Sequence, residues 1–253
     1  MDGQRDPERM ATVLQGIVDE PDPEFITKTK KDDNPKGLAT LDMAIKTLGY
    51  QKVITADAEA KTWGKVIVAH VSIRYTEATL LQAAQENKSG QADWRLIFVS
   101  GYSLREQLKI LGTNEKKQPC FYKGLDGGMW FLDSKEDGWS TRRNQAGYYL
   151  IDFRPHWDGM DHDKQGARLK KMGPKFERVD PAVFSSAVLT DFKVSGVRLI
   201  NYHEHWYHWS EVMSSSGNFI TVGLVPEGLR INAYPVYNGA SQLRVCIFWK
   251  FDA

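Results

Sequence analysis

Residues 214–253 read SSSGNFITVGLVPEGLRINAYPVYNGASQLRVCIFWKFDA and contain three short runs in which apolar residues recur at every second position. This spacing places one face of a β-strand in a protein core. The residues of this apolar frame are Ile220, Val222, Leu229, Ile231, Leu243, Val245 and Ile247. The positions around them carry side chains of no common chemical type. We therefore expect a strand scaffold that displays varied side chains on its other face.

The composition is that of a soluble globular protein. The 253 residues are 42% hydrophobic and 26% charged, enough for one good core or two small ones. Because 33 basic residues nearly balance 32 acidic ones, the charge gives no reason to expect nucleic acid as a partner.

Targeting signals are not evident in the chain. No apolar run approaches the roughly 20 residues that span a bilayer, and MDGQRDPERM lacks the pattern of a secretory signal. We expect cytoplasmic synthesis, compatible with later display on a virion or cell surface. Without a secretory signal, Cys120 and Cys246 are expected to be reduced.

Local patterns predict an N-terminal extension over 1–60, with a short helix at 40–48, and a folded domain over 61–253. Further helices are expected at 76–88, from the Ser103–Glu106 capping box to about 111, and after the Asp180-Pro181 start signal. Apolar and β-branched runs predict strands at 65–75, 120–122, 129–132, 147–153, 197–201, 218–223, 229–232 and 243–248.

One histidine cluster is a candidate metal site. His203, Glu204, His205 and His208 lie close together in the sequence, and His203 and His205 would share one face of a strand. The spacing differs from the helical zinc-protease motif. We favour structural histidines in an aromatic strand beside a groove.

A second cluster combines His156, Asp158, Asp161, His162 and Asp163 around a glycine. Carboxylates at this density can hold calcium through loop oxygens, but the offsets of an EF-hand are absent. A solvated acidic loop is the favoured interpretation, and we predict no cofactor or metal.

Nucleophilic catalysis has little support in the sequence. It has no Gly-x-Ser-x-Gly elbow and no glycine-rich phosphate loop, and Cys246 lies inside a strand pattern. The basic run at 168–175 is interpreted as a solvated face.

Several strings carry a family resemblance, together with the order strand, helix, helix, long loops and closing strands. They are Trp94-Arg95-Leu96, Gly101-Tyr102-Ser103-Leu104-Arg105-Glu106, Phe176-Glu177-Arg178, Trp206-Tyr207-His208-Trp209, Leu243-Arg244-Val245-Cys246-Ile247 and Lys250-Phe251. The order resembles a C-type lectin fold. Together with the strings, it looks like the variable proteins of diversity-generating retroelements, over about residues 60–253.

The resemblance implies an α+β, C-type lectin-like fold of the formylglycine-generating-enzyme-like subtype, with two main helices, antiparallel sheets and long loops. In that family a reverse transcriptase rewrites adenines in a C-terminal variable repeat, here about 214–253, and the changed residues bind a ligand. Carried over by position, the implied ligand-binding residues are Phe219, Thr221, Pro226, Arg230, Asn232, Tyr234, Val236, Tyr237, Asn238, Ser241 and Phe248.

The sequence also departs from relatives of that fold. The triplets that bind calcium and sugar in lectins are absent, and a lone Cys246 does not supply the paired cysteines of formylglycine-generating enzymes. We therefore expect a non-enzymatic binding protein for host or cell-surface recognition, with a macromolecular ligand, preferably a protein. The oligomeric state stays open, with a monomer favoured.

Two alternatives remain at this stage. One is a metal-dependent or formylglycine-generating-type enzyme that uses either His/Asp cluster. The other is a structural virion or adhesin component whose C-terminal end packs against another subunit.

Overall fold

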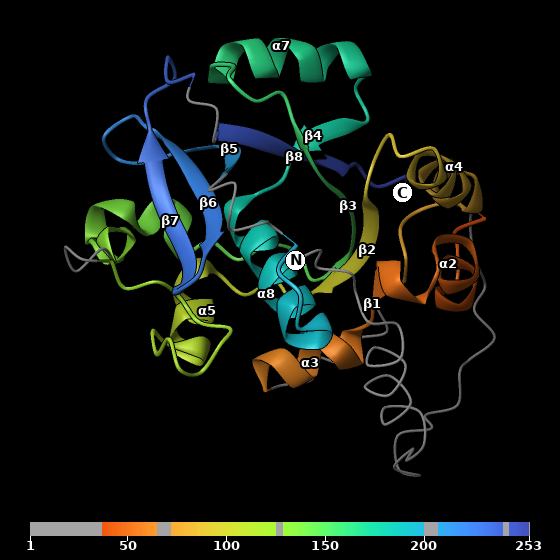
Figure 1. The fold of residues 1–253 in the computed structure, drawn as a ribbon, viewed down its shortest axis with the longest axis horizontal. Helices are drawn as coiled ribbons and strands as arrows, with labels where there is room; N and C mark the ends of the chain where they lie inside the picture. Colours follow the sequence, from red (N-terminus) through yellow and green to blue (C-terminus); the bar gives the residue numbers. More distant parts are fainter. Residues whose placement is uncertain (1–36, 65–71, 125–128, 200–206, 240–242, 253) are drawn as a thin grey trace.

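The structure is a computed structural model that describes residues 37–64, 72–124, 129–199, 207–239 and 243–252. These residues form an α+β fold with an eight-stranded mixed sheet and several helices (Figure 1). The α+β class predicted from the sequence is therefore confirmed. Within the described ranges, none of the helices has both the length and the apolar character needed to cross a membrane.

The helices and strands have the following bounds. The helices are α2 (Leu41–Leu48), α3 (Ala56–Trp63), α4 (Glu77–Lys88), α5 (Leu104–Leu111), α6 (Asp137–Ser140), α7 (His162–Met172) and α8 (Pro181–Ser195). The strands are β1 (Val53–Ile54), β2 (Trp94–Val99), β3 (Gly147–His156), β4 (Phe176–Arg178), β5 (Tyr207–Met213), β6 (Phe219–Val225), β7 (Gly228–Tyr234) and β8 (Leu243–Trp249). The 3-10 turns are η2 (Tyr50–Lys52), η3 (Trp130–Leu132) and η4 (Ser134–Glu136).

Strand β8 joins the two halves of the sheet, whose order is β1-β2-β3-β8-β5-β6-β7, with β4 also paired to β8. Its first residues, Leu243 and Arg244, pair in parallel with β5, while Ile247 to Trp249 pair antiparallel with β4. The β1–β2 pair is also parallel. The expected purely antiparallel sheet is wrong at these two pairs. At β5–β8 the reason is the strand order. Strand β8 follows β7 in the chain but lies beside β5, so the chain passes back over β6 and β5 before it forms β8.

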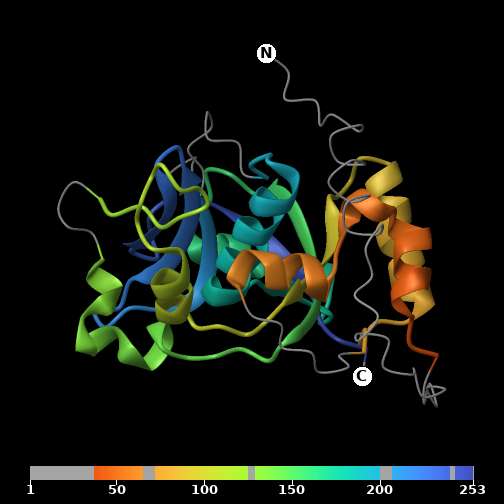
Figure 2. The ribbon, with the colours of Figure 1, turned by 90° about the horizontal axis from the view of Figure 1, so that it is seen from below.

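Two cores lie on opposite faces of β2. Ile97 and Val99 belong to the core that α8 shares with β6, whereas Leu96 and Phe98 belong to the core covered by α2 and α4. Figures 1 and 2 place α2 and α4 at one end of the molecule and the β6–β7 hairpin at the other. Helix α8 packs between them, against β2, β6, α3 and α5.

Helix starts follow the capping signals of the sequence. The side chain of Thr40 accepts a hydrogen bond from the Met43 amide at the start of α2, and Asp180 accepts one from the Ala182 amide at the start of α8. At α5, Ser103 and Glu106 form the complete capping box. The helices predicted at these starts and at α4 are confirmed.

The structure also corrects several element predictions. Residues 129–132 form a 3-10 turn, in which the Leu132 amide bonds to the Met129 carbonyl, instead of a strand. The described parts of two further predicted strands, 72–75 and 197–199, are not strands, and the remainder of each lies outside the described residues. The prediction of two main helices is incomplete, because α7 and α8 are similar to α4 in length or longer.

The boundary predicted at residue 60 falls inside α3. Residues that precede it, such as Ala44 and Val53, are buried in the same core as Trp249 near the other end of the chain. The described part of the N-terminal segment therefore packs with the sheet.

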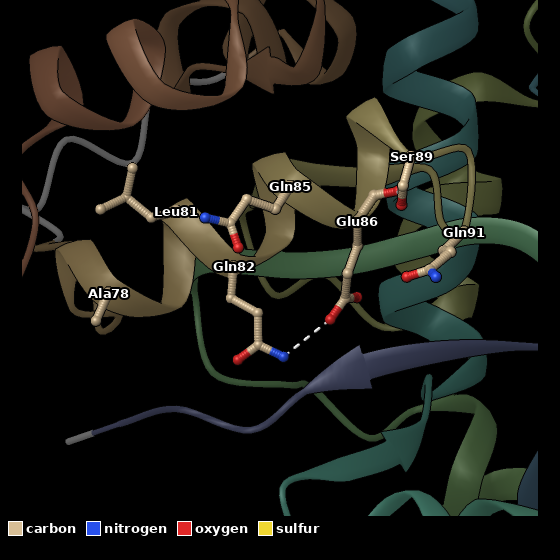
Figure 3. A pocket seen from close by; sticks show the side chains of 7 residues that line it. All are labelled: Ala78, Leu81, Gln82, Gln85, Glu86, Ser89 and Gln91. Carbon is tan, nitrogen blue, oxygen red and sulfur yellow. Dashed lines mark hydrogen bonds between the residues drawn. The ribbon is translucent and has the colours of Figure 1, made fainter.

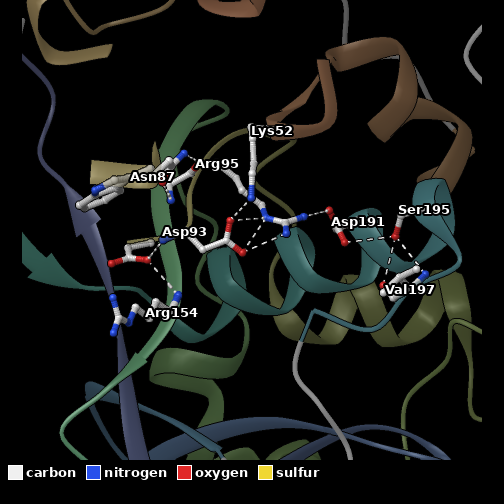
Figure 4. A network of polar contacts seen from close by, with 10 residues as sticks. Lys52, Asn87, Asp93, Arg95, Arg154, Asp191, Ser195 and Val197 are labelled. Atoms are coloured by element: carbon white, nitrogen blue, oxygen red, sulfur yellow. Dashed lines mark hydrogen bonds and ion pairs between the residues drawn. The ribbon is translucent and has the colours of Figure 1, made fainter. Parts of the chain in front are cut away.

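A network of buried charges ties β2 to α8 (Figure 4). The Arg95 guanidinium donates to Asp191 of α8 at 2.8 Å and to Asp93 at 3.0 Å, and Lys52 pairs with the same Asp93. The side chains of Arg95 and Asp191 are each only 4% exposed. The network extends to β3, because the Asp93 amide donates to Asp152 at 2.7 Å.

The outer edge of β7 is covered by segments from earlier in the chain. The Tyr122 amide donates to the Leu229 carbonyl and the Leu229 amide donates to the Cys120 carbonyl, both at 2.8 Å. The Trp130 indole donates to the Ile231 carbonyl at 3.1 Å. A Cβ on Gly228 would lie 2.6 Å from the Cys120 carbonyl oxygen, so this close approach requires glycine.

Candidate ligand-binding surface

The β6–β7 hairpin separates the apolar frame from the variable-looking residues. Cross-strand partners are Phe219 with Tyr234, Thr221 with Asn232, and Gly223 with Arg230. These residues share one face of the hairpin, because side chains alternate along a strand. The other face carries Ile220, Val222, Leu229 and Ile231 of the frame, which are buried in one core cluster. The remaining frame residues, Leu243, Val245 and Ile247 of β8, are also buried but belong to other clusters.

Seven of the proposed ligand-binding residues lie on this hairpin face or in the turn that follows β7. Arg230 is exposed, Asn232 and Tyr234 are half-buried, and Tyr237 is 81% exposed. The turn begins at the end of β7 where Phe219 faces Tyr234. We call these seven residues the display surface: Phe219, Arg230, Asn232, Tyr234, Val236, Tyr237 and Asn238.

The other four proposed residues lie elsewhere. Thr221 is on the same face but is 0% exposed, so its side chain does not reach the surface. Pro226 lies in the turn at the opposite end of the hairpin. Phe248 is half-buried in β8 and packs against Tyr149, with ring centroids 5.4 Å apart. Ser241 lies outside the described residues.

Two aromatic residues of the neighbouring strand β5 lie on the same face and pack beside the display surface. The Tyr207 ring lies directly over Gly223, where an added Cβ would come within 2.3 Å of the ring. Its centroid is 6.4 Å from that of Tyr234. Trp209 is fully buried beside Thr221, its cross-strand partner. Because position 223 is a glycine, the Tyr207 ring can occupy the space that a side chain at this position would fill.

His162, at the start of α7, anchors the far end of the display surface. Its ring stacks on Phe219 with centroids 3.6 Å apart, and its backbone amide donates to the Val236 carbonyl at 3.1 Å. Burial and the nearby Arg178 lower the pKa of His162, so the ring is neutral at neutral pH. The turn after β7 is thus held against a fixed helix end.

Arg230 lies among tyrosines. Its guanidinium carbon is 5.6 Å from the centroid of the Tyr122 ring. Burial raises the pKa of Tyr207. The positive charge of Arg230 opposes this rise, because the two side chains lie close together.

Four neighbours of this surface are not among the ligand-binding residues predicted from the sequence: Tyr122, Tyr207, Trp209 and His162. Tyr207 and Trp209 did carry a signal, because they alternate with His208 as residues of one strand face do.

The first candidate metal cluster is only partly described. His203, Glu204 and His205 lie outside the described residues. His208 is fully buried, its Nδ1 accepts from the Cys246 amide at 3.1 Å, and its Nε2 donates to the Val179 carbonyl at 2.7 Å. Burial lowers the pKa of His208 to about 3. This neutral histidine therefore links β5 to β8 and to the segment before α8 by hydrogen bonds.

The residues of the second candidate cluster make separate contacts with their own neighbours. His156 pairs with Asp152 at 2.8 Å, and Asp161 caps α7 by accepting from the Lys164 amide. Asp158 lies 3.6 Å from Arg244. Across the ranges that the structure describes, no three residues of the types His, Cys, Asp and Glu come together as metal ligands. Both cysteines are buried and unpaired.

Two grooves of comparable size lie away from the display surface. One, of about 740 Å³, runs along α4, and Figure 3 shows its lining residues. Its one carboxylate, Glu86, is held by Gln82 and by the Trp94 indole, which donates at 2.6 Å. The other, of about 730 Å³, lies between α7 and β4, where Lys250 pairs with Glu177 and Arg142 with Asp180. These carboxylates are engaged in contacts within the protein.

No family model, curated protein or solved structure matches this chain. The function is therefore argued from the residues themselves.

Proposed function

We propose that this chain is a non-catalytic binding protein that presents the display surface to a macromolecular ligand, preferably a protein, in host or cell-surface recognition. One observation carries the proposal. Chemically unrelated side chains lie together on one face and turn of the β6–β7 hairpin, above a buried and regular apolar frame.

The composition of the display surface supports a role in binding. Tyrosine offers a large, rigid contact area with a polar end, asparagine offers adaptable hydrogen bonds, and arginine is enriched at energetically important contacts. Tyr234, Tyr237, Asn232, Asn238 and Arg230 supply these chemistries. Exposed positions also tolerate substitution far better than core positions do, so one frame can carry many surfaces.

We further propose that the scaffold is C-type lectin-like and that the surface is diversified as in variable proteins of diversity-generating retroelements. The strings quoted in the sequence analysis support this. The histidines of the alternative enzyme clusters that are described are engaged by neighbouring protein groups, which also favours binding over catalysis.

Sequencing of the encoding locus tests diversification. We expect a near-identical repeat of the segment that encodes 214–253, differing at adenines, next to a reverse transcriptase gene. A complete genome without the repeat and the gene would contradict diversification, while the display surface could still be tested by binding.

A further inference from the structure

Arg230 differs from most arginines of the described chain in its electrostatic surroundings. Six others each lie within 4 Å of a carboxylate: Arg95, Arg105, Arg142, Arg143, Arg178 and Arg244. Arg230 makes no ion pair with a described residue, although it is exposed and lies at the end of the display surface opposite the turn that follows β7. Its charge is therefore not neutralised by a carboxylate of the described residues.

Neutral groups hold the Arg230 side chain in place. Tyr122 lies against the guanidinium, and Tyr207 lies next to it. When the Asn232 amide is oriented to satisfy its neighbours, its oxygen accepts from Arg230 Nε at 3.3 Å and its nitrogen donates to the Ile231 carbonyl. Tyr207 is itself fixed, because its ring rests on the backbone of β6 at Gly223.

This arrangement leaves donors for a ligand. A guanidinium carries five N–H groups in a planar fork, more than Asn232 and Tyr207 can engage. The fork matches the two oxygens of a carboxylate, and a side chain that is already held loses little entropy when it binds.

We propose that Arg230 receives a carboxylate of the ligand, namely an Asp or Glu side chain of a protein partner. The inference rests on the proposed binding function and specifies the chemistry of the ligand at one position. A protein is favoured over an acidic carbohydrate because exposed Tyr237 and Met213 add apolar contact area near the hairpin end.

The probe is a phage-displayed library of random twelve-residue peptides, selected on the immobilised full-length chain. Selection on the double variant Tyr234→Ala/Tyr237→Ala is run in parallel and identifies peptides that use the display surface. We expect those peptides to be enriched in Asp or Glu at a recurrent position. Arg230→Gln is expected to weaken their binding about tenfold to a hundredfold, the usual effect of a lost charge-assisted hydrogen bond.

A charge reversal and a matched control sharpen the test. With Arg230→Glu, the selection is expected to shift from acidic peptides to peptides that carry Lys or Arg. Arg168→Gln makes the same charge change on an exposed part of α7 and is expected to leave the wild-type peptides bound. Unchanged thermal unfolding of each variant shows that the fold is intact.

The possible outcomes separate the inference from the proposed function. Peptides that depend on Tyr234 and Tyr237 but lack acidic enrichment and ignore Arg230→Gln would overturn the carboxylate inference alone. Failure to obtain any peptide that distinguishes the chain from the double variant would overturn the proposed protein-binding function as well. Binding to sialylated or uronic-acid glycans on an array, abolished by Arg230→Gln and without peptide enrichment, would overturn the protein assignment.

Discussion

At the scale of single residues, Glu59 is a carboxyl group placed where its charge is unfavourable. It is 1% exposed in α3, and one of its oxygens accepts from the Ser100 amide at 2.7 Å. Burial raises the pKa of Glu59 from 4.5 to about 7, despite these hydrogen bonds. Because the folded pKa exceeds the unfolded one, the folded state is favoured by protonation. This stabilisation is complete below pH 4.5 and is lost as the pH rises to about 7.

We predict that Glu59→Gln raises the free energy of unfolding at pH 8 by about 3 kcal/mol, since the pKa shift from 4.5 to about 7 corresponds to about 1.4 kcal/mol per unit. The difference from wild type should shrink toward zero well below pH 4.5, at about pH 3.5, where Glu59 is mostly neutral in both states. Urea unfolding at the two pH values measures it.

The matched control is Asp57→Asn, which removes an exposed carboxyl from the same helix. A Glu59→Gln effect that is equal at both pH values would show that burial of the charge is not its cause.

His208 responds to pH in the opposite sense. Burial lowers its pKa from 6.5 to about 3, so the folded state is favoured by the neutral ring. The stability that this provides is complete above about pH 6.5 and is lost as the pH falls toward 3. Because the buried Glu59 lowers stability at high pH and the buried His208 lowers it at low pH, the two groups together favour a maximum in the free energy of unfolding at intermediate pH.

At the scale of elements, the ion pair of Arg95 with Asp191 links β2 to α8 in the interior. A buried pair contributes little relative to apolar residues, but the loss of Asp191 leaves the buried Arg95 with only Asp93, which is 30% exposed and also pairs with Lys52. We predict that Asp191→Ala lowers the free energy of unfolding by about 3 kcal/mol. The double variant Arg95→Met/Asp191→Leu should recover most of that loss. Denaturant unfolding of the single and double variants measures the coupling.

An exposed pair serves as the control for this cycle. Glu177→Ala breaks the contact of Glu177 with Lys250, whose side chains are 54% and 43% exposed, and should cost less than about 1 kcal/mol. Equal losses for Asp191→Ala and Glu177→Ala would contradict the role given to burial.

Elements with local signals could be predicted from the sequence. The caps of α2, α5 and α8 identify their starts, and strict alternation identifies β6, β7 and β8. Strand β2 was missed because both of its faces are buried, so its apolar residues do not alternate with polar ones. Helix α7 was missed because its sequence, HDKQGARLKKM, buries Leu169 but has no apolar stripe.

The candidate surface could be predicted only in part. The sequence pattern identifies the outward positions of β7, since period two is a property of a single strand. The pattern does not show which of the outward-facing side chains are covered by residues of a neighbouring strand. Thr221 is covered because Trp209 and Tyr207 of β5 lie on the same face, which depends on strand pairing across the fold.

At the scale of the whole molecule, the frame and the display surface should differ in their tolerance to substitution. We predict that Arg230→Ala, Asn232→Ala and Tyr237→Ala each change the free energy of unfolding by less than about 0.5 kcal/mol. Ile231→Ala, between two of them on the same strand, should cost about 2 to 4 kcal/mol because it leaves a cavity. Thermal or urea unfolding of the four variants compares them, and similar losses at all positions would contradict the separation.

The covered edge of β7 limits how a partner can approach. Tyr122 and Trp130 already occupy the outward carbonyls of Leu229 and Ile231, so an incoming peptide cannot extend the sheet there by backbone pairing. Under the proposed binding function, recognition would therefore rest on side chains, which substitution can change. The same covering keeps the edge of β7, which carries the aromatic residue Tyr234, from pairing with the edge strand of another chain.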